Sequence, residues 1–255
     1  MAMSLNPMEQ FEVKPLVAEP LLHIGSHPIY FTNQALLMVI VVALASLFLT
    51  LTVKPGRLVP TRGQSMAEAS YEFVANMIHS ATGEDGLKFF PFIFTLFIFV
   101  LFCNFLGMVP WSFTVTSQIA VTFALAAFVV LMVIVVGFMK HGFHFLSLFV
   151  PKAPFVLLIL LVPIEIISFL TRPLSLSVRL FANMLAGHTM LAVFGGFVVA
   201  LGGAGGILSV LSLGPMLLIV AIMLLELLVA FLQAYVFAIL TCIYLNEALH
   251  LHDNH

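Results

Sequence analysis

The sequence predicts an all-α polytopic membrane protein, and three observations lead to this fold class. Hydrophobic residues occupy 62% of the 255 positions, whereas an ordinary soluble protein has roughly 45 to 50%. Charged residues occupy only 8%, which is too few to cover the surface of a soluble domain. Long uncharged runs recur along the chain, as helices that cross a bilayer require. A water-soluble globular protein is therefore excluded.

The charge and the cysteines narrow the class of function. A formal net charge of -2 without a basic patch excludes a nucleic-acid-binding protein. Cys103 and Cys242 both lie inside apolar runs, which fits neither a disulfide framework nor zinc ligation. The glycine-rich turn at 202–206 follows no strand and lacks a phosphate-binding Gly-Lys-Ser/Thr motif. We therefore expect no nucleotide site, no cofactor and no metal on this chain.

Residues 1–33 are expected to form an extramembrane arm, and residues 34–255 a single membrane domain. The arm is mixed and mildly acidic, and it lacks the basic start and apolar core of a signal peptide. The first span is expected at 34–53, because 20 residues of helix measure about 30 Å and match the hydrocarbon core.

An amphipathic helix at the membrane interface is expected at 64–82. Its apolar residues recur at helical spacing on the side opposite its polar residues. Ser65 and Glu68 have the spacing of a capping box at its start. The apolar residues are Met66, Phe73, Val74, Met77, Ile78 and Ala81, and the polar ones are Glu68, Glu72, Asn76 and His79.

Four further spans follow the interfacial helix. Residues 89–109 and 116–139 are expected to form an antiparallel hairpin, whose turn carries Trp111, a residue type typical of membrane interfaces. Residues 154–200 and 213–249 are expected to form two long, tilted helices that make the last hairpin. The first of these runs has 47 residues, about 70 Å of helix against a core of about 30 Å, so it must tilt steeply or break. The candidate break points are Pro163, Pro173 and the Gly195-Gly196 pair.

The basic residues of the short loops predict the orientation of the chain. With the N-terminus outside and five crossings, six basic residues fall on the inner side and one on the outer side. The inner residues are Lys54, Arg57, Arg62, Lys88, Lys140 and Lys152, and the outer one is Lys14. The C-terminus is therefore expected inside.

The fourth span carries charges that cost at least about 2.5 to 3.5 kcal/mol each at the centre of a membrane. Glu165, Arg172 and Arg179 are spaced by seven residues and share one helix face, with Asn183 one turn beyond. For Glu165 and Arg172, snorkelling or mutual pairing competes with a functional role. Arg179 has no carboxylate within two turns in sequence, so it is either a structural clamp to Gln233 or a functional charge whose partner lies on another chain.

The fifth span carries a matching polar stripe. Glu226 and Gln233 are again seven residues apart, and Tyr244 falls on the same face. His188 on the fourth span can meet Glu226 if the two spans form a hairpin. Such a contact is either a structural hydrogen bond or a proton relay, because histidine titrates near neutral pH.

The residues around these charges resemble those of a known family. The run Arg172–His188, which reads RPLSLSVRLFANMLAGH, resembles the signature of subunit a of the F-type ATP synthases. Asn104–Pro110, Gln118 and residues 225–237 resemble other motifs of that family. The resemblance covers most of the chain from the first span onward, and Asn6–Glu12 resembles the start of mitochondrial and alphaproteobacterial members.

The resemblance implies a non-catalytic, proton-translocating stator subunit that offers two half-channels to a rotating ring of c subunits. Arg179 would be the family's essential arginine, which faces the ring and separates the half-channels, with Asn183 and Gln233 supporting it. In many bacterial members the residue types at 188 and 226 are exchanged, which implies that this pair acts as a unit. The implied residues of the proton-access paths are Glu165, His188 and Glu226, with Tyr244 grouped beside them.

The resemblance also implies partners and a location. The partners are the c-ring, the b-type subunits of a peripheral stalk and the lipid bilayer. The location is a bacterial cell inner membrane with a cytoplasmic C-terminus, and the mitochondrial inner membrane is the alternative. An independent transporter that carries an ion or small anion on Arg179 is the alternative function, although five unequal spans show no inverted repeat. An intramembrane hydrolase would need a nucleophile or metalloprotease motif, which the sequence lacks.

Overall fold

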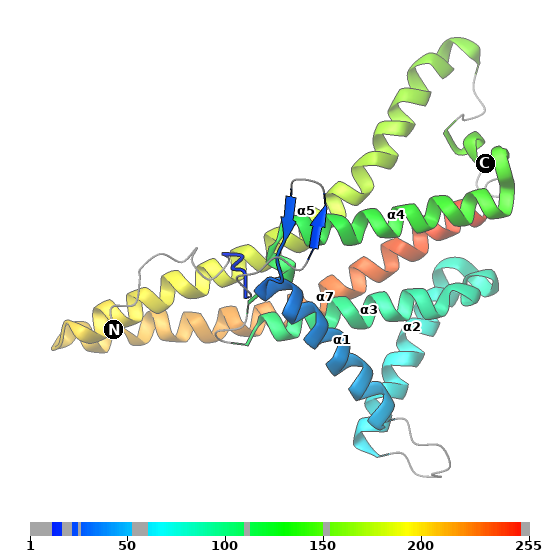
Figure 1. Cartoon of the computed structure of the whole chain (residues 1–255). Coiled ribbons are helices and arrows are strands. Elements are labelled where there is room, and N and C mark those ends of the chain that lie inside the picture. Colours follow the sequence, from blue (N-terminus) through cyan, green and yellow to red (C-terminus); the bar gives the residue numbers. More distant parts are fainter. Residues whose placement is uncertain are drawn as a thin grey trace. The chain divides into compact units, whose positions relative to one another are not determined.

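The computed structural model describes residues 12–16, 22–24, 27–52, 61–109, 113–149 and 154–250. Within these ranges the regular elements are helices, apart from one pair of three-residue strands (Figure 1). The elements, with η for a 3-10 helix, are β1 (Leu22–Ile24), β2 (His27–Ile29), α1 (Asn33–Thr52), α2 (Arg62–Gly86), η2 (Leu87–Phe89), α3 (Phe90–Gly107), η3 (Val115–Ser117), α4 (Ile119–His141), η4 (Gly142–Phe149), α5 (Phe155–Gly203), α6 (Ile207–Leu211) and α7 (Leu213–Leu249).

Five helical stretches are long and apolar enough to cross a membrane. They are Asn33–Thr52, Arg62–Gly107, Ile119–Leu146, Leu157–Gly203 and Ser209–Leu249. Large apolar side chains are exposed along all of them, which is the expected surface of helices surrounded by lipid. The prediction of an all-α polytopic membrane protein is confirmed.

The fourth span forms one continuous helix, so the alternative of a break was wrong. α5 has 49 residues, about 74 Å of helix, and it passes through both Pro163 and Pro173. A proline removes one backbone hydrogen bond, but membrane helices tolerate this because neighbouring groups satisfy the freed carbonyl. The glycine pair at 195–196 also lies inside the helix.

The chain groups into two compact units, each built from segments that are distant in sequence. Unit 1 contains the described residues up to Ser46, together with Phe99–Gln118 and Leu180–Gln233. Unit 2 contains Leu47–Ile98, Ile119–Arg179 and the chain from Ala234 onward. Each of the helices α5 and α7 is therefore divided, with one part in unit 1 and the other part in unit 2.

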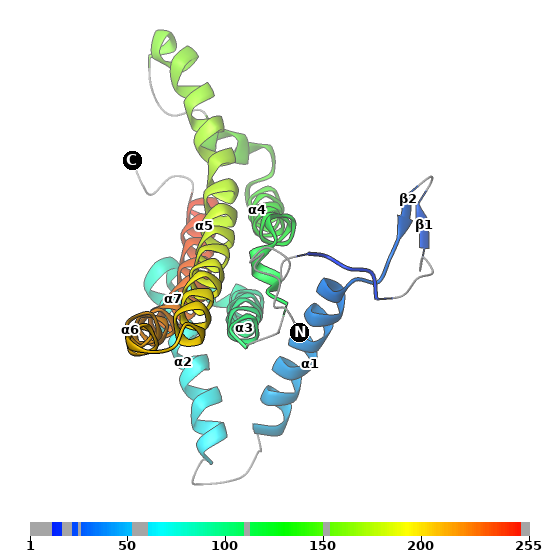
Figure 2. The same cartoon turned by 90° about the vertical axis from the view of Figure 1, so that its left-hand side faces the viewer.

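In unit 1 the described part of the arm pairs with the start of α1. The Leu16 amide donates to the Phe31 carbonyl at 2.8 Å, and the Asn33 amide donates to the Lys14 carbonyl at 3.1 Å. The antiparallel strands β1 and β2, visible side by side in Figure 2, lie in the chain between the two segments that this contact joins. The sequence did not predict these strands, which are too short to show a periodic pattern.

Also in unit 1, the second part of α5 and the first part of α7 form a hairpin. Figures 1 and 2 both show the yellow part of α5 alongside the orange part of α7. The turn between them uses Gly205 and Gly206 at positive φ angles of 71° and 62°, a conformation that glycine adopts without a Cβ clash. α3 packs against this hairpin, where the buried Asn104 side chain donates from Nδ2 to the Ala230 carbonyl at 3.1 Å. The predicted last hairpin is confirmed within this unit.

In unit 2, η4 folds back onto the end of α4. The Phe145 ring is buried in a cluster with Val133 and Ala248, and Tyr244 packs against it. Gly137 allows this approach, because a Cβ at that position would lie 2.2 Å from Cε2 of Phe145. A larger residue at 137 would therefore displace the ring.

The helix α2, which the sequence places at the membrane interface, starts earlier than expected. Thr61 rather than Ser65 caps α2, because the Thr61 hydroxyl accepts from the Gln64 amide at 3.4 Å. Glu68 does not complete a capping box and instead accepts from the Gln64 side chain at 2.8 Å. Met66, expected on the apolar face, is 63% exposed, whereas the four polar positions expected on the opposite face are exposed as predicted.

Some sequence predictions fall outside the described residues. They concern most of the N-terminal arm, the interfacial Trp111 and three of the basic residues used for the orientation, Lys54, Arg57 and Lys152.

Candidate functional site

Arg172 on α5 pairs with Glu247 near the end of α7, within unit 2. The guanidinium Nη1 donates to Oε2 of Glu247, and the two side chains are 20% and 31% exposed. The same guanidinium lies over two rings, 5.1 Å from the centroid of Tyr244 and 5.7 Å from that of Phe169. Arg172 is therefore neutralised by Glu247 rather than by Glu165, the partner that sequence spacing suggested.

Arg179 lies in the same unit, two turns further along α5, but in a different environment. Its side chain is exposed among exposed apolar neighbours such as Leu174 and Val178. Within the described part of the chain, no hydrogen bond or ion pair includes Arg179, although its charge interacts with Tyr244 through space. A guanidinium on an apolar membrane surface is costly without a counter-charge, so this position favours a partner outside the chain.

His188 and Glu226 meet in unit 1, as the sequence suggested. Nε2 of His188 lies 3.5 Å from Oε1 of Glu226, with the two side chains 13% and 5% exposed. The same nitrogen lies 3.2 Å from Oγ1 of Thr114, a residue that the sequence argument did not single out. Glu226 lies against the backbone of α5, because a Cβ on Gly187 would come within 2.7 Å of its Oε1.

The carboxylate of Glu226 is incompletely satisfied. Its Oε1 is buried, and it accepts no hydrogen bond from any residue that the structure describes. A buried acceptor of this kind costs free energy unless water or a proton satisfies it. A bound water molecule or a proton shared with His188 would satisfy this oxygen.

Asn183 and Gln233 form a second contact between α5 and α7 in unit 1. Nδ2 of Asn183 donates to Oε1 of Gln233 at 3.1 Å. Asn183 is exposed whereas Gln233 is only 4% exposed, and Nε2 of Gln233 has no hydrogen-bond partner in the described ranges. Both N–H donors of this buried amide are thus without a partner among the described residues.

The structure joins most of the predicted residues in pairs but leaves Glu165 apart. Glu165 is half-exposed on α5 in unit 2, and the ion pairs of the described residues do not include it. Glu247 was not predicted, although the seven-residue spacing of Glu226 and Gln233 continues to 240 and 247. No group of three or more His, Cys, Asp or Glu side chains that could hold a metal occurs in the described ranges.

Comparison with known proteins identifies the family. The family model for the ATP synthase A chain matches residues 35–246. The chain belongs to this family. ATP synthase subunit a of Mesorhizobium japonicum is 57% identical over 247 residues, 96% of this chain and 97% of the relative. The subunit a of Chelativorans sp. is 57% identical over 249 residues, 97% of this chain and 99% of the relative, and that of Hyphomonas neptunium is 55% identical over 250 residues, 98% of both.

Membership of the ATP synthase A chain family confirms the resemblance seen in the sequence. The matched region includes Arg179, the His188–Glu226 pair and Tyr244, but it ends one residue before Glu247. Glu247 is therefore identified as the partner of Arg172 by the structure and not by the family match.

Proposed function

We propose that this chain is the proton-translocating stator subunit of the membrane sector of an F-type ATP synthase. Two half-channels lead to a rotating c-ring, and Arg179 separates them. The observation that carries the proposal is the exposed guanidinium of Arg179 on an apolar helix surface, with no ion pair among the described residues. Relatives that are 55–57% identical over almost the whole chain are named ATP synthase subunit a, which supports it.

Arg179 acts on a carboxylate of the passing c subunit. At about 4 Å, in an effective dielectric near 20, a fixed guanidinium favours the carboxylate anion by about 4 kcal/mol. The carboxylate therefore releases its proton when it meets Arg179 and binds one before it returns to lipid. Because arginine does not release its own proton, it blocks direct passage between the half-channels.

The Arg172–Glu247 pair supports this assignment of the ring-facing charge. Arg172 shares the helix face of Arg179, so an unpaired Arg172 would offer the ring a second cation. Glu247 neutralises it, and the rings of Tyr244 and Phe169 hold it in place. Arg179 then presents the unpaired guanidinium of this stripe.

The His188–Glu226 pair handles protons on the outer side. By the positive-inside count, α5 runs from inside to outside and α7 returns, so both residues fall in the outer half. A proton entering there meets the pair before the ring, and Asn183 with Gln233 supports the helix contact beside it. Glu165 belongs to the inner exit path.

The chain is non-catalytic and works as part of a larger assembly. Moving one charge across the membrane yields about 2.3 kcal/mol per 100 mV, so several charge steps must be accumulated by rotation of the c-ring. Beside the ring, b-type subunits of the peripheral stalk anchor the chain. It lies in a bacterial cell inner membrane with the N-terminus outside and the C-terminus in the cytoplasm, the mitochondrial inner membrane being the alternative.

The substitution Arg179→Ala in the intact complex tests the proposal. We expect c subunits and the soluble ATPase head to co-purify with the variant chain as with the parent. ATP synthesis and ATP-driven proton pumping in vesicles should fall by about a thousandfold, because about 4 kcal/mol of carboxylate stabilisation is lost. Coupled synthesis at a near-normal rate would refute the proposal, as would the absence of c subunits from the parent preparation.

A further inference from the structure

Unit 2 contains a cavity where three apolar helices end. It has a volume of about 460 Å³, which falls in the range of about 300 to 1,000 Å³ typical of ligand sites. α3 begins beside it at Phe90, α4 ends there at His141 and α7 ends there at Leu249. Because membrane-spanning helices end near the membrane surface, we place the cavity mouth at that level.

The walls of the cavity are apolar. Among the residues that line it, Val136 and Leu249 are buried, whereas Val135 and Met139 are exposed. The charged side chains that line it are Asp85, Lys88 and Lys140. The apolar residues that line the cavity are Phe89, Met132, Val135, Val136, Met139 and Leu249.

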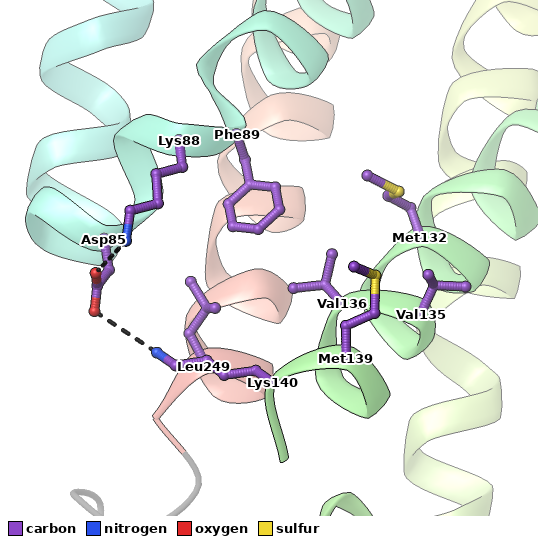
Figure 3. Close-up of a pocket in the computed structure, with 9 residues that line it drawn as sticks. All are labelled: Asp85, Lys88, Phe89, Met132, Val135, Val136, Met139, Lys140 and Leu249. Atoms are coloured by element: carbon purple, nitrogen blue, oxygen red, sulfur yellow. Dashed lines mark hydrogen bonds and ion pairs between the residues drawn. The ribbon is translucent and has the colours of Figure 1, made fainter. Parts of the chain in front are cut away.

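The mouth of the cavity carries a net positive charge. Asp85 lies between two lysines (Figure 3), with Oδ1 at 3.2 Å from Nζ of Lys88 and Oδ2 at 3.6 Å from Nζ of Lys140. Each ammonium group has three N–H donors, so both retain donors beyond their contact with Asp85. The side chains of Lys88 and Lys140 are 77% and 39% exposed, and two cations against one anion leave one positive charge.

We propose that this cavity binds an anionic phospholipid, with its phosphate on Lys88 and Lys140 and one acyl chain along Met132 and Val136. Basic pockets between membrane helices attract anionic headgroups, and apolar walls below such a headgroup fit its acyl chain. Asp85 holds the two ammonium groups around one mouth, so a single phosphate can contact both. The lipid then bridges the start of α3 and the end of α4.

Photolabelling of the intact complex tests the site. The purified complex is placed in nanodiscs of phosphatidylcholine containing a small fraction of phosphatidylglycerol with a diazirine on its acyl chain. Mass spectrometry then measures adducts on the peptide that contains Met132 and Met139. We expect labelling by this probe to exceed labelling by phosphatidylcholine with the same diazirine, and unlabelled phosphatidylglycerol to compete it away.

Two pairs of variants separate the headgroup contact from the acyl-chain contact. The substitutions Lys88→Gln and Lys140→Gln should each lower labelling by about fivefold, and the double variant should lower it by about 25-fold. The control is Arg62→Gln, which removes an exposed cation outside the cavity and should leave labelling unchanged. Met132→Phe, which fills the cavity, should also lower labelling, unlike Leu131→Phe at an exposed position outside its lining.

Three results would overturn the proposal. They are equal labelling by the two probes, labelling that the lysine variants leave unchanged, and cross-linking of this peptide to another subunit that occupies the cavity. The experiment measures labelling and not proton pumping, so a negative result for the lipid site would leave the proposed function untouched, and the reverse also holds.

Discussion

Two charged contacts join α5 to α7, one in each unit, and they differ in how fully they are satisfied. In unit 2, Arg172 and Glu247 form an ion pair that two aromatic rings brace. In unit 1, His188 and Glu226 are more deeply buried, yet Oε1 of Glu226 accepts no hydrogen bond from the described residues. A contact that only holds two helices together is most stable when every polar atom in it is paired. A contact that exchanges protons must instead be stable in both its protonated and its deprotonated form.

The environments of the two arginines follow the same division. Arg172 is half-buried and paired, while Arg179, seven residues later on the same face, is exposed and unpaired among the described residues. Since both are guanidinium groups on one helix, the neighbouring side chains decide which of them keeps an exposed, unpaired charge among the described residues. The following predictions test whether these differences correspond to different functions.

The largest effect is expected from Arg179→Lys, which keeps the charge but removes the planar group. A lysine in a desolvated site can release its proton, so it neither fixes the ring carboxylate nor blocks direct proton passage. Coupled ATP synthesis in inverted vesicles should be lost as in the alanine variant. Arg172→Lys is the matched control, because the ion pair with Glu247 can re-form, and it should retain most of the activity.

The next largest effect concerns the pair in unit 1. His188→Ala and Glu226→Ala should each slow ATP-driven proton flux by about a hundredfold, the usual contribution of a positioned acid or base, without causing a proton leak. The exchanged variant, His188→Glu with Glu226→His, should recover more activity than the two single losses combined predict. Additive losses, or a leak in place of a block, would show that the two groups are separate structural residues.

A smaller effect is expected from Glu247→Gln. The substitution frees Arg172, whose guanidinium lies about 10 Å along α5 from Arg179 and can compete for the ring carboxylate. Proton pumping should fall by about five- to tenfold, and the second substitution Arg172→Gln should restore it. Glu72→Gln, an exposed carboxylate on α2, provides the control. If the double variant were no better than Glu247→Gln alone, the pair would serve only to hold the helices.

The smallest effect is expected at the surface. Glu12 and Lys14 form an ion pair at 3.4 Å, but their side chains are 64% and 66% exposed. Such pairs contribute about 0 to 1 kcal/mol, so Lys14→Gln should leave the thermal stability of the complex and its proton pumping unchanged. A large loss would mean that the arm contacts another subunit through this residue.

The sequence was sufficient for the fold class and for most of the helix boundaries. The first span was expected at 34–53 and α1 occupies Asn33–Thr52, because an apolar run has clear ends where polar residues begin. Met66 was misplaced because helical spacing defines a face without showing how far neighbouring helices cover it. Contacts made by turn residues, such as Thr114 with His188, have no periodic signal and required the structure.

The candidate site was only partly predictable for a related reason. Spacing by seven placed Arg172 and Arg179 on one face, but it could not distinguish a paired arginine from an unpaired one. That distinction depends on Glu247, which lies 75 residues from Arg172 in sequence. The role of Gly187 could not be predicted from the sequence either, because this glycine acts by leaving room for the carboxylate of Glu226.

Because α5 is one continuous helix, it restricts where residues can be inserted into this chain or deleted from it. Each inserted residue would rotate everything beyond it by about 100° around the helix axis. An insertion between Arg172 and His188 would therefore turn one of their side chains away from α7 while the other kept its place. Insertions and deletions should accumulate beyond the ends of the helix and be absent from the 15 residues between Arg172 and His188.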